Sequence, residues 1–205
     1  MKVLKILVKA IFAGIMIAIG GTIFLMSENN VIGSCLFAIG LFTIVVNDLN
    51  LFTGKVGYII GADMGFVVEV FLTLIGNFIG TFLVGSMLQY TRMSKFLIDK
   101  SNGIVNIKLS DGIFSIIILS VFCGILMYLA VNGYKMIEDS IGKYLAVFLG
   151  VVVFILSGFE HCVANMYYFT IANVWSLHAV GYMLIMILGN SAGAILFSVS
   201  EKFIK

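Results

Sequence analysis

The chain has no proline and very little charge. Proline is absent from all 205 residues, and Asp, Glu, Lys and Arg together make up only 11% of them. Hydrophobic residues contribute 61%, and the mean hydropathy is +1.17. A soluble domain carries about 25% charged residues, so this composition excludes one. We therefore expect an all-α integral membrane protein with no soluble catalytic domain, and the missing proline removes the Asn-Pro-Ala signature of water channels.

Cysteine and histidine are also scarce. The three cysteines lie within apolar stretches, and an odd number so placed argues against a disulfide framework. Glu160, His161 and Cys162 are adjacent, but neighbouring residues on a helix do not face a common point, and no second ligand pair follows. We predict no metal, no other cofactor and no nucleic-acid partner.

Apolar runs predict six membrane spans, because a bilayer core needs about 20 residues per helix. The second and fifth runs are interrupted by polar residues and read as broken spans. One polar connection, residues 91–111, divides a single channel domain, 1–205, into halves of about 1–90 and 112–199. The spans are expected at about 6–26, 31–61 (broken), 66–90, 112–134, 143–173 (broken) and 177–199.

The fifth span places Glu160, His161 and Asn165 inside apolar sequence. Ionisable groups are costly in hydrocarbon, so those that occur there usually serve function. The alternative for His161 is a buried histidine satisfied by a backbone carbonyl.

The two halves resemble each other. The segment Gly76–Gly80 recurs 113 residues later as Gly189–Gly193, with a Gly-Asn pair at the start of each. The same shift pairs Asp48 with His161, so both interruptions fall at matching places. Because each half has three spans, the second copy must be inverted, giving a 3+3 repeat.

Without proline, the breaks are expected to depend on Gly54, Gly57, Gly61 and Gly158 and on local polar side chains. Asp48 is interpreted as a cap of the second half-helix or as a residue that holds the loop by hydrogen bonds. The Gly-x-x-x-Gly faces, with Gly14, Ala18 and Gly21 of the first span, are expected to offer helix contacts beyond the monomer.

Several motifs together resemble the formate/nitrite transporter family over essentially the whole chain, and most closely its hydrosulfide-channel branch. They are Asn50-Leu51-Phe52-Thr53-Gly54, Gly158-Phe159-Glu160-His161, Ala164-Asn165-Met166 and Gly189-Asn190. The resemblance implies an aquaporin-like fold, a homopentamer with one pore per subunit, and passage of small monovalent anions.

The same resemblance assigns roles to individual residues. His161 is the implied central histidine and Thr53 the threonine of the break loop, while Lys108, Glu160 and Asn165 are implied to support them. Gly124 stands where formate-type members carry an asparagine, which suggests a lost polar lining group. The implied constriction residues are Phe37, Leu41, Leu51 and Phe154.

The residues support this reading in their own right. Phe37 and Leu41 are four apart, so they share a helical face and can narrow a pore to an apolar slit that excludes hydrated ions by dewetting. Plain helix packing is the alternative. Thr53 and His161 offer hydrogen-bond donors to an anion stripped of water, and a protonated His161 can pass its proton to a weak-base anion.

Hydrosulfide suits such a step because its conjugate acid titrates near neutrality, and formate or nitrite is the alternative anion. A remote alternative is an intramembrane serine hydrolase, because Gly189–Gly193 fits Gly-x-Ser-x-Gly and His178 precedes it. Ser191 and His178, however, lie 13 residues apart, about 20 Å along a helix. We therefore do not predict an enzyme.

Basic residues in the short loops predict the orientation. With the N-terminus inside, seven lysines lie on the inner side, whereas Arg92, Lys95, Lys100 and Lys108 lie outside. Both termini are expected to be cytoplasmic, in the inner (cytoplasmic) membrane of the cell. The seven inner lysines are Lys2, Lys5, Lys9, Lys135, Lys143, Lys202 and Lys205.

Overall fold

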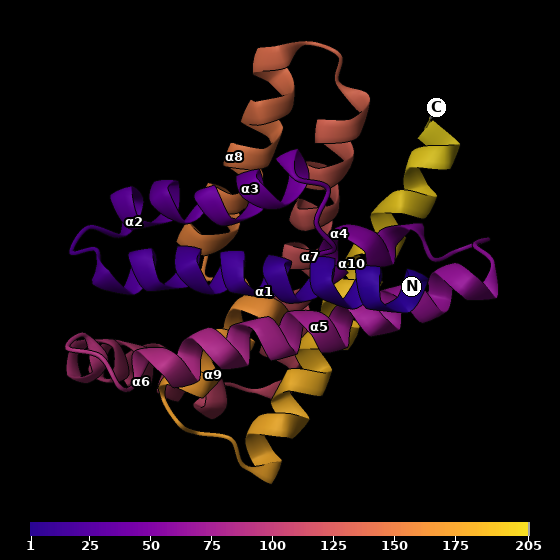
Figure 1. Cartoon of the computed structure of the whole chain (residues 1–205). Coiled ribbons are helices and arrows are strands. Elements are labelled where there is room, and N and C mark those ends of the chain that lie inside the picture. The colour runs from indigo at the N-terminus through magenta and orange to yellow at the C-terminus, as the bar shows by residue number, and fades with distance from the viewer. Residues whose placement is uncertain (205) are drawn as a thin grey trace.

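The computed structural model describes residues 1–204, which form helices and connecting turns with no strand in that range (Figure 1). The first half contains α1 (Lys2–Met26), α2 (Asn30–Phe37), α3 (Ile39–Val46), α4 (Phe52–Lys55), the 3-10 turn η1 (Val56–Tyr58) and α5 (Met64–Leu88). The second half contains α7 (Ile113–Met136), α8 (Ser140–Leu156), α9 (Cys162–Ile171) and α10 (Leu177–Ile204). Between the halves lies α6 (Ser94–Ser110).

Four helices, α1, α5, α7 and α10, are long and apolar enough to cross a membrane. The segment of α2 and α3 and the helix α8 are apolar but shorter. Each is followed by a turn and a short helix, α4 or α9, where the sequence predicted a broken span. One interruption was not predicted: the second span is also broken at Ala38, between α2 and α3.

The connection between the halves is largely helical. The sequence marked residues 91–111 only as a polar connection, but 17 of them form α6. Leu97, Ser101 and Val105 are its buried residues, and the Ser101 hydroxyl donates a 2.8 Å hydrogen bond to the Tyr168 carbonyl of α9. Their four-residue spacing is a helical signal that was readable in the sequence.

Glycines bring α5 against α1, and α10 against α7, at very close range. A Cβ added to Gly80 would lie 2.1 Å from the Ile11 carbonyl oxygen, and one added to Gly193 would lie 2.0 Å from that of Val121. These faces are therefore used inside the subunit, as are Gly14, Ala18 and Gly21, which are all buried. The prediction that they offer contacts beyond the monomer is wrong.

Both half-helices before the breaks end in the same turn. Asp48 has φ +49° and Gly158 has φ +68°, and the next amide reaches back to close the turn in each case. The Leu49 amide donates to the Ile44 carbonyl at 2.9 Å, and the Phe159 amide to the Phe154 carbonyl at 3.0 Å. This is the Schellman pattern, in which a left-handed residue satisfies the last helical carbonyls.

This turn corrects the register of the repeat. Gly158 lies 110 residues after Asp48, so Gly158 is the counterpart of Asp48, and the predicted pairing of Asp48 with His161 is wrong. His161 corresponds instead to Leu51, and these two residues are the N-caps of α9 and α4. The shift of 113 holds only for the third helix of each half, because the second half contains three additional residues after its break.

Two predictions about the first break need correction. Gly54 and Gly57 do not make it, since they lie in α4 and η1 against Val131 and Tyr128. Asp48 does not cap a helix, but its side chain accepts a 2.5 Å hydrogen bond from Lys9 Nζ of α1, which agrees with the alternative that it holds the loop by hydrogen bonds.

Candidate pore and its polar centre

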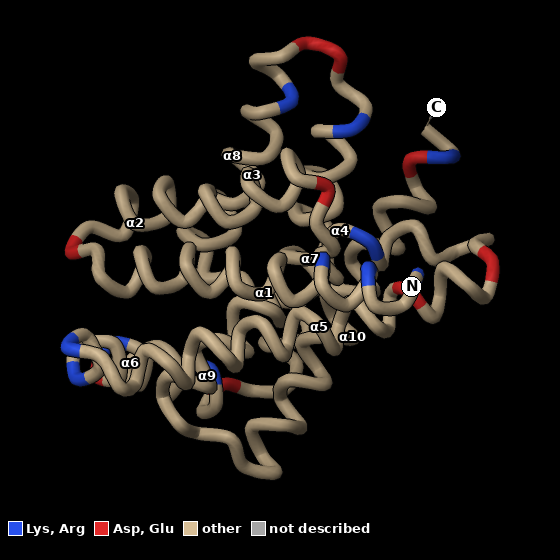
Figure 2. The backbone as a smooth tube through the Cα atoms, in the orientation of Figure 1, with Lys and Arg blue, Asp and Glu red and all other residues tan. Residues whose placement is uncertain are grey.

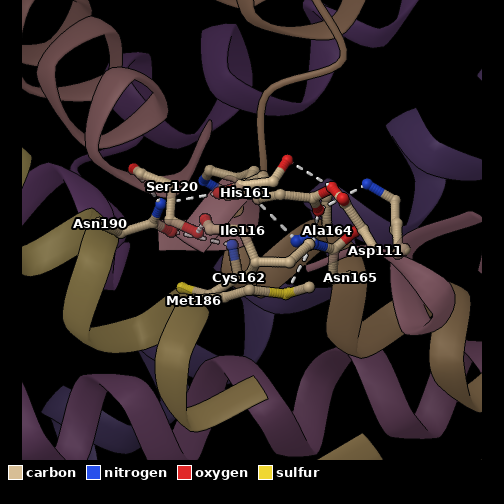
Figure 3. A network of polar contacts seen from close by, with 12 residues as sticks. Asp111, Ile116, Ser120, His161, Cys162, Ala164, Asn165, Met186 and Asn190 are labelled. Atoms are coloured by element: carbon tan, nitrogen blue, oxygen red, sulfur yellow. Dashed lines mark hydrogen bonds and ion pairs between the residues drawn. The ribbon is translucent and has the colours of Figure 1, made fainter. Parts of the chain in front are cut away.

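Two buried asparagines hold the unwound backbone at the breaks. Asn190 of α10 donates to the carbonyls of Ser120 and Glu160 at 2.8 and 2.7 Å and accepts from the Cys162 amide at 2.9 Å (Figure 3). In lipid, unpaired backbone groups cost several kcal/mol each, so a break needs such partners.

Asn77 of α5 does the same for the first break. Its amide donates to the carbonyls of Ala10 and Asn50, both at 2.8 Å, and its oxygen accepts from the Phe52 amide at 2.8 Å. In the sequence, the Gly-Asn pairs indicated the repeat, and Gly189-Asn190 also contributed to the family resemblance, but neither asparagine was predicted to hold a break. Their recurrence in two apolar helices was the signal for this role.

His161 joins the two breaks. It begins α9, where Nδ1 accepts a 3.0 Å hydrogen bond from the Ala164 amide, and Nε2 lies 2.9 Å from Thr53 Oγ1 of α4. A ring nitrogen that accepts from a backbone N–H carries no proton, so in this arrangement the ring proton is on Nε2, facing Thr53. Both side chains are almost fully buried. The alternative of a histidine held by a backbone carbonyl is wrong.

The four predicted constriction residues are buried, and one of them contacts His161 directly. The Phe154 ring stacks on His161 with centroids 5.3 Å apart, and the Phe37 ring meets Phe154 edge-on at 6.0 Å. Leu41 and Leu51 are buried with them. The structure thus brings Phe37 and Phe154, from different halves of the chain, together beside the histidine.

An ion pair lies next to His161. Lys108 Nζ, from α6, is 2.6 Å from Glu160 Oε2, and the same oxygen accepts from Asn165 Nδ2 at 2.6 Å. Asn165 also lies 3.1 Å from the sulfur of Met186 (Figure 3). Lys108 and Glu160 have side chains only 12% and 4% exposed, so each charge depends on the other for compensation.

Two cavities lie next to the residues of the two breaks. The first, of about 310 Å³, is bordered by α6 and reaches Phe154 and His161; we call it the α6 cavity. The second, also of about 310 Å³, reaches Leu51 and Gly54 beside α4; we call it the α4 cavity. Phe37, Leu41 and Thr53 line neither of these two cavities.

Gly124 does not lie where the sequence suggested. A Cβ at this position would be 2.1 Å from the Asn190 carbonyl oxygen, so Gly124 is a contact between α7 and α10 with no space for a side chain. The interpretation of a missing polar lining group at position 124 is therefore wrong.

The serine motif is likewise part of helix packing. The Ser191 hydroxyl donates to the Ile187 carbonyl of its own helix at 2.7 Å. The His178 ring packs against the Tyr182 ring at a tilt of 59°, and both ring nitrogens of His161 are engaged with other groups. The geometry does not assemble a nucleophile with its base.

Comparison with known proteins agrees with this arrangement. A family model described as "Formate/nitrite transporter" matches residues 1–201. The chain belongs to the formate/nitrite transporter family. It is a multi-pass membrane protein of a family of channels and transporters, and it is not an enzyme.

Relatives within the family are distant. A "Formate-nitrite transporter" of Plasmodium knowlesi (strain H) is 26% identical in a gapped alignment of 201 positions that covers 82% of this chain and 64% of that protein. One of Plasmodium vivax is 26% identical in a gapped alignment of 234 positions that covers 95% of this chain and 75% of its own length. The chain thus spans less than two thirds of the first of these relatives.

Two solved structures share the fold. One, described as "Pentameric formate channel with formate bound", has a TM-score of 0.84 at 22% identity and covers 99% of this chain and 97% of its own. Another, described as "FNT family ion channel", has a TM-score of 0.83 at 20% identity, with coverage of 98% and 90%. At these identities the likeness establishes the fold alone.

Proposed function

We propose that this protein is a channel for small monovalent anions, with hydrosulfide as its main anion. The observation that carries the proposal is the contact between Thr53 and His161, which joins the two breaks in the interior of the protein. On either side of this contact we place the α6 and α4 cavities as the two vestibules of one path.

The apolar residues next to the contact form the proposed slits. An anion in such a slit leaves its water, and dewetting excludes larger or strongly hydrated ions. The donors available to replace that water are few, namely the Thr53 hydroxyl and His161 Nε2–H. A small weak-base anion that takes up a proton from water in a vestibule and crosses as the neutral acid suits so sparse a lining. His161 is not the proton donor in this arrangement, because its Nδ1 accepts from the Ala164 amide and the ring is neutral. The residues proposed to line the slits are Phe37, Leu41, Leu51 and Phe154.

Formate or nitrite conduction through the same path is the second candidate. It is favoured by the family to which the chain belongs and by a shared fold with a channel that holds formate. The close packing at Gly124 also removes the sequence argument against formate.

We further propose a homopentamer of subunits with six spans in an inverted 3+3 repeat, in the inner (cytoplasmic) membrane with both termini cytoplasmic. Matched turns at Asp48 and Gly158, and matched asparagines 77 and 190, support the repeat. Support for five subunits comes from the pentameric channel with the same fold. Native mass spectrometry in detergent is expected to give a ring of five.

The central test is flux into liposomes, compared for hydrosulfide, formate and nitrite. His161→Ala should assemble normally but change the flux or its dependence on pH. His178→Ala is the matched control, because this second histidine is exposed and its ring contacts only that of Tyr182 among the aromatic rings of residues 1–204. Unaltered flux in His161→Ala at every pH would remove the histidine from the path, and formate or nitrite flux above that of hydrosulfide would reassign the anion.

A further inference from the structure

Of the lysines that line the two cavities, some pair with a carboxylate and others make no ion pair within residues 1–204. The ion pairs among residues 1–204 are Lys9–Asp48, Lys55–Glu69 and Lys108–Glu160. A lysine in contact with a carboxylate contributes little net field at a distance, because the two charges cancel. Figure 2 shows the charged residues gathered on α6, at the turn between α7 and α8 and around the N-terminus.

Lys100 is the other lysine that lines the α6 cavity. It lies on α6 two turns before Lys108, and both side chains border the cavity together with Ile104. Its Nζ lies 5.6 Å from the centre of the Phe96 ring, and within the described chain it makes no ion pair. Asp99 is adjacent in sequence but is not in contact with its charge.

Lys135 is the corresponding lysine of the α4 cavity: it lines the cavity, lies over an aromatic ring and makes no ion pair within residues 1–204. It borders this cavity beside the ion-paired Lys55, and its Nζ lies 4.4 Å from the centre of the Tyr58 ring. The Tyr58 hydroxyl is held by Asn132 at 3.0 Å, which fixes the ring beneath the ammonium group. Cation–π contact positions a cation without neutralising it, and no carboxylate of residues 1–204 is paired with Lys135.

We propose that Lys100 and Lys135, one in each cavity, are the residues that capture the anion, whereas Lys108 and Lys55 serve their own ion pairs. This inference depends on the proposed anion channel. Each cavity then holds one lysine that lies on an aromatic ring and makes no ion pair, in a path whose centre has only neutral donors. The Asp48 carboxylate also lines the α4 cavity, but it is paired with Lys9. The positive charge of a lysine without an ion pair raises the local anion concentration and the rate of entry, and salt screens it.

The experiment is the ionic-strength dependence of anion flux into liposomes, with hydrosulfide and nitrite as probes and empty liposomes as background. At about 10 mM salt the screening length is about 30 Å, and at 0.15 M it is about 8 Å. Lys100→Gln and Lys135→Gln should each lower flux about two- to threefold at the lower salt, and the loss should disappear at the higher salt. Lys100→Arg and Lys135→Arg should restore the flux.

Two lysines that line neither cavity serve as controls. Lys95→Gln changes the charge of α6 at a position outside the α6 cavity, and Lys143→Gln removes an ammonium that also lies over aromatic rings, those of Tyr134 and Tyr144. At the lower salt both should lower the flux by less than Lys100→Gln and Lys135→Gln do, because neither side chain lines a cavity, and at 0.15 M both should leave it unchanged.

The outcomes separate this inference from the proposed function. A wild-type protein that conducts neither probe would remove the channel proposal itself. A conducting wild type with unchanged Lys100→Gln and Lys135→Gln flux at 10 mM would overturn the capture role alone. A loss that persists at 0.15 M, or that the controls match in size, would also overturn it, because the effect would then not come from a screened charge inside the cavity.

Discussion

The side-chain oxygen of Asn190 accepts a 2.9 Å hydrogen bond from the backbone amide of Cys162, the first residue of α9. The side-chain oxygen of Asn77 accepts the equivalent 2.8 Å bond from the amide of Phe52, the first residue of α4. Each amide nitrogen also donates to two carbonyls, one at the break and one on the first helix of the same half. One side chain thus closes both ends of an unwound segment and ties it to its neighbours.

Asn190→Ala is therefore expected to destabilise the protein strongly. It leaves the Cys162 amide and the Ser120 and Glu160 carbonyls without this partner, at a cost of about 2–4 kcal/mol. Thermal unfolding in detergent measures the effect. Ser191→Ala is the neighbouring control and should cost less than about 1 kcal/mol, because Ser191 bonds only within its own helix. Equal melting temperatures for the two variants would contradict the role of Asn190.

Gly124→Ala should prevent normal packing of α7 against α10. The added Cβ would lie 2.1 Å from the Asn190 carbonyl oxygen, which belongs to helix backbone and has no room to move. We expect loss of monodisperse protein on size-exclusion chromatography. Gly103→Ala is the control, since a Cβ there meets nothing within 4 Å and should add up to about 1 kcal/mol of helix stability. A well-folded Gly124→Asn variant with altered anion preference would restore the lining interpretation.

Glu160 and Lys108 should behave as a unit. Lys108→Met leaves a carboxylate that is only 4% exposed without its cation, at a cost of about 3–5 kcal/mol. Lys108→Met combined with Glu160→Gln should recover much of that stability, because no buried charge then lacks a partner. A double-mutant cycle on thermal stability gives the coupling, and additive losses would show that the pair is not coupled.

Phe154→Ala should relax the exclusion of larger anions by widening the slit beside His161. Leu41→Ala should act in the same direction. Flux ratios between hydrosulfide and a larger anion measure the effect. Phe169→Ala is the matched control, because Phe169 is fully buried against Trp175 and lines neither cavity. If Phe154→Ala and Phe169→Ala lower stability equally and neither changes selectivity, Phe154 is a packing residue.

The sequence alone determined the membrane environment, the helical class and the two interruptions. These follow from local quantities, namely the length of an apolar run and the polar residues that stop it. His161 was also singled out in this way, whereas Thr53 and the four constriction residues were assigned from the family resemblance. The structure then brought His161, Thr53, Phe37 and Phe154 into one cluster.

Only the tertiary structure decided the register of the repeat and the partners of the polar groups. The equivalence of Asp48 with Gly158 cannot be recognised from the sequence, because the two side chains are dissimilar. What the two residues have in common is a backbone with positive φ, which glycine and, less often, aspartate tolerate. Three additional residues after the second break then displace the matching Gly-Asn pairs, so one shift cannot align both regions.

The ion pair of Lys108 with Glu160 joins residues 52 apart in the chain, and the crowding at Gly124 involves a carbonyl 66 residues away. Which residues meet over such separations depends on how helices cross, and helix crossing depends on side-chain volume on both partners. Composition and spacing describe one segment at a time. They therefore predict where a membrane span is interrupted, but not which residues bond to the backbone groups of the interruption.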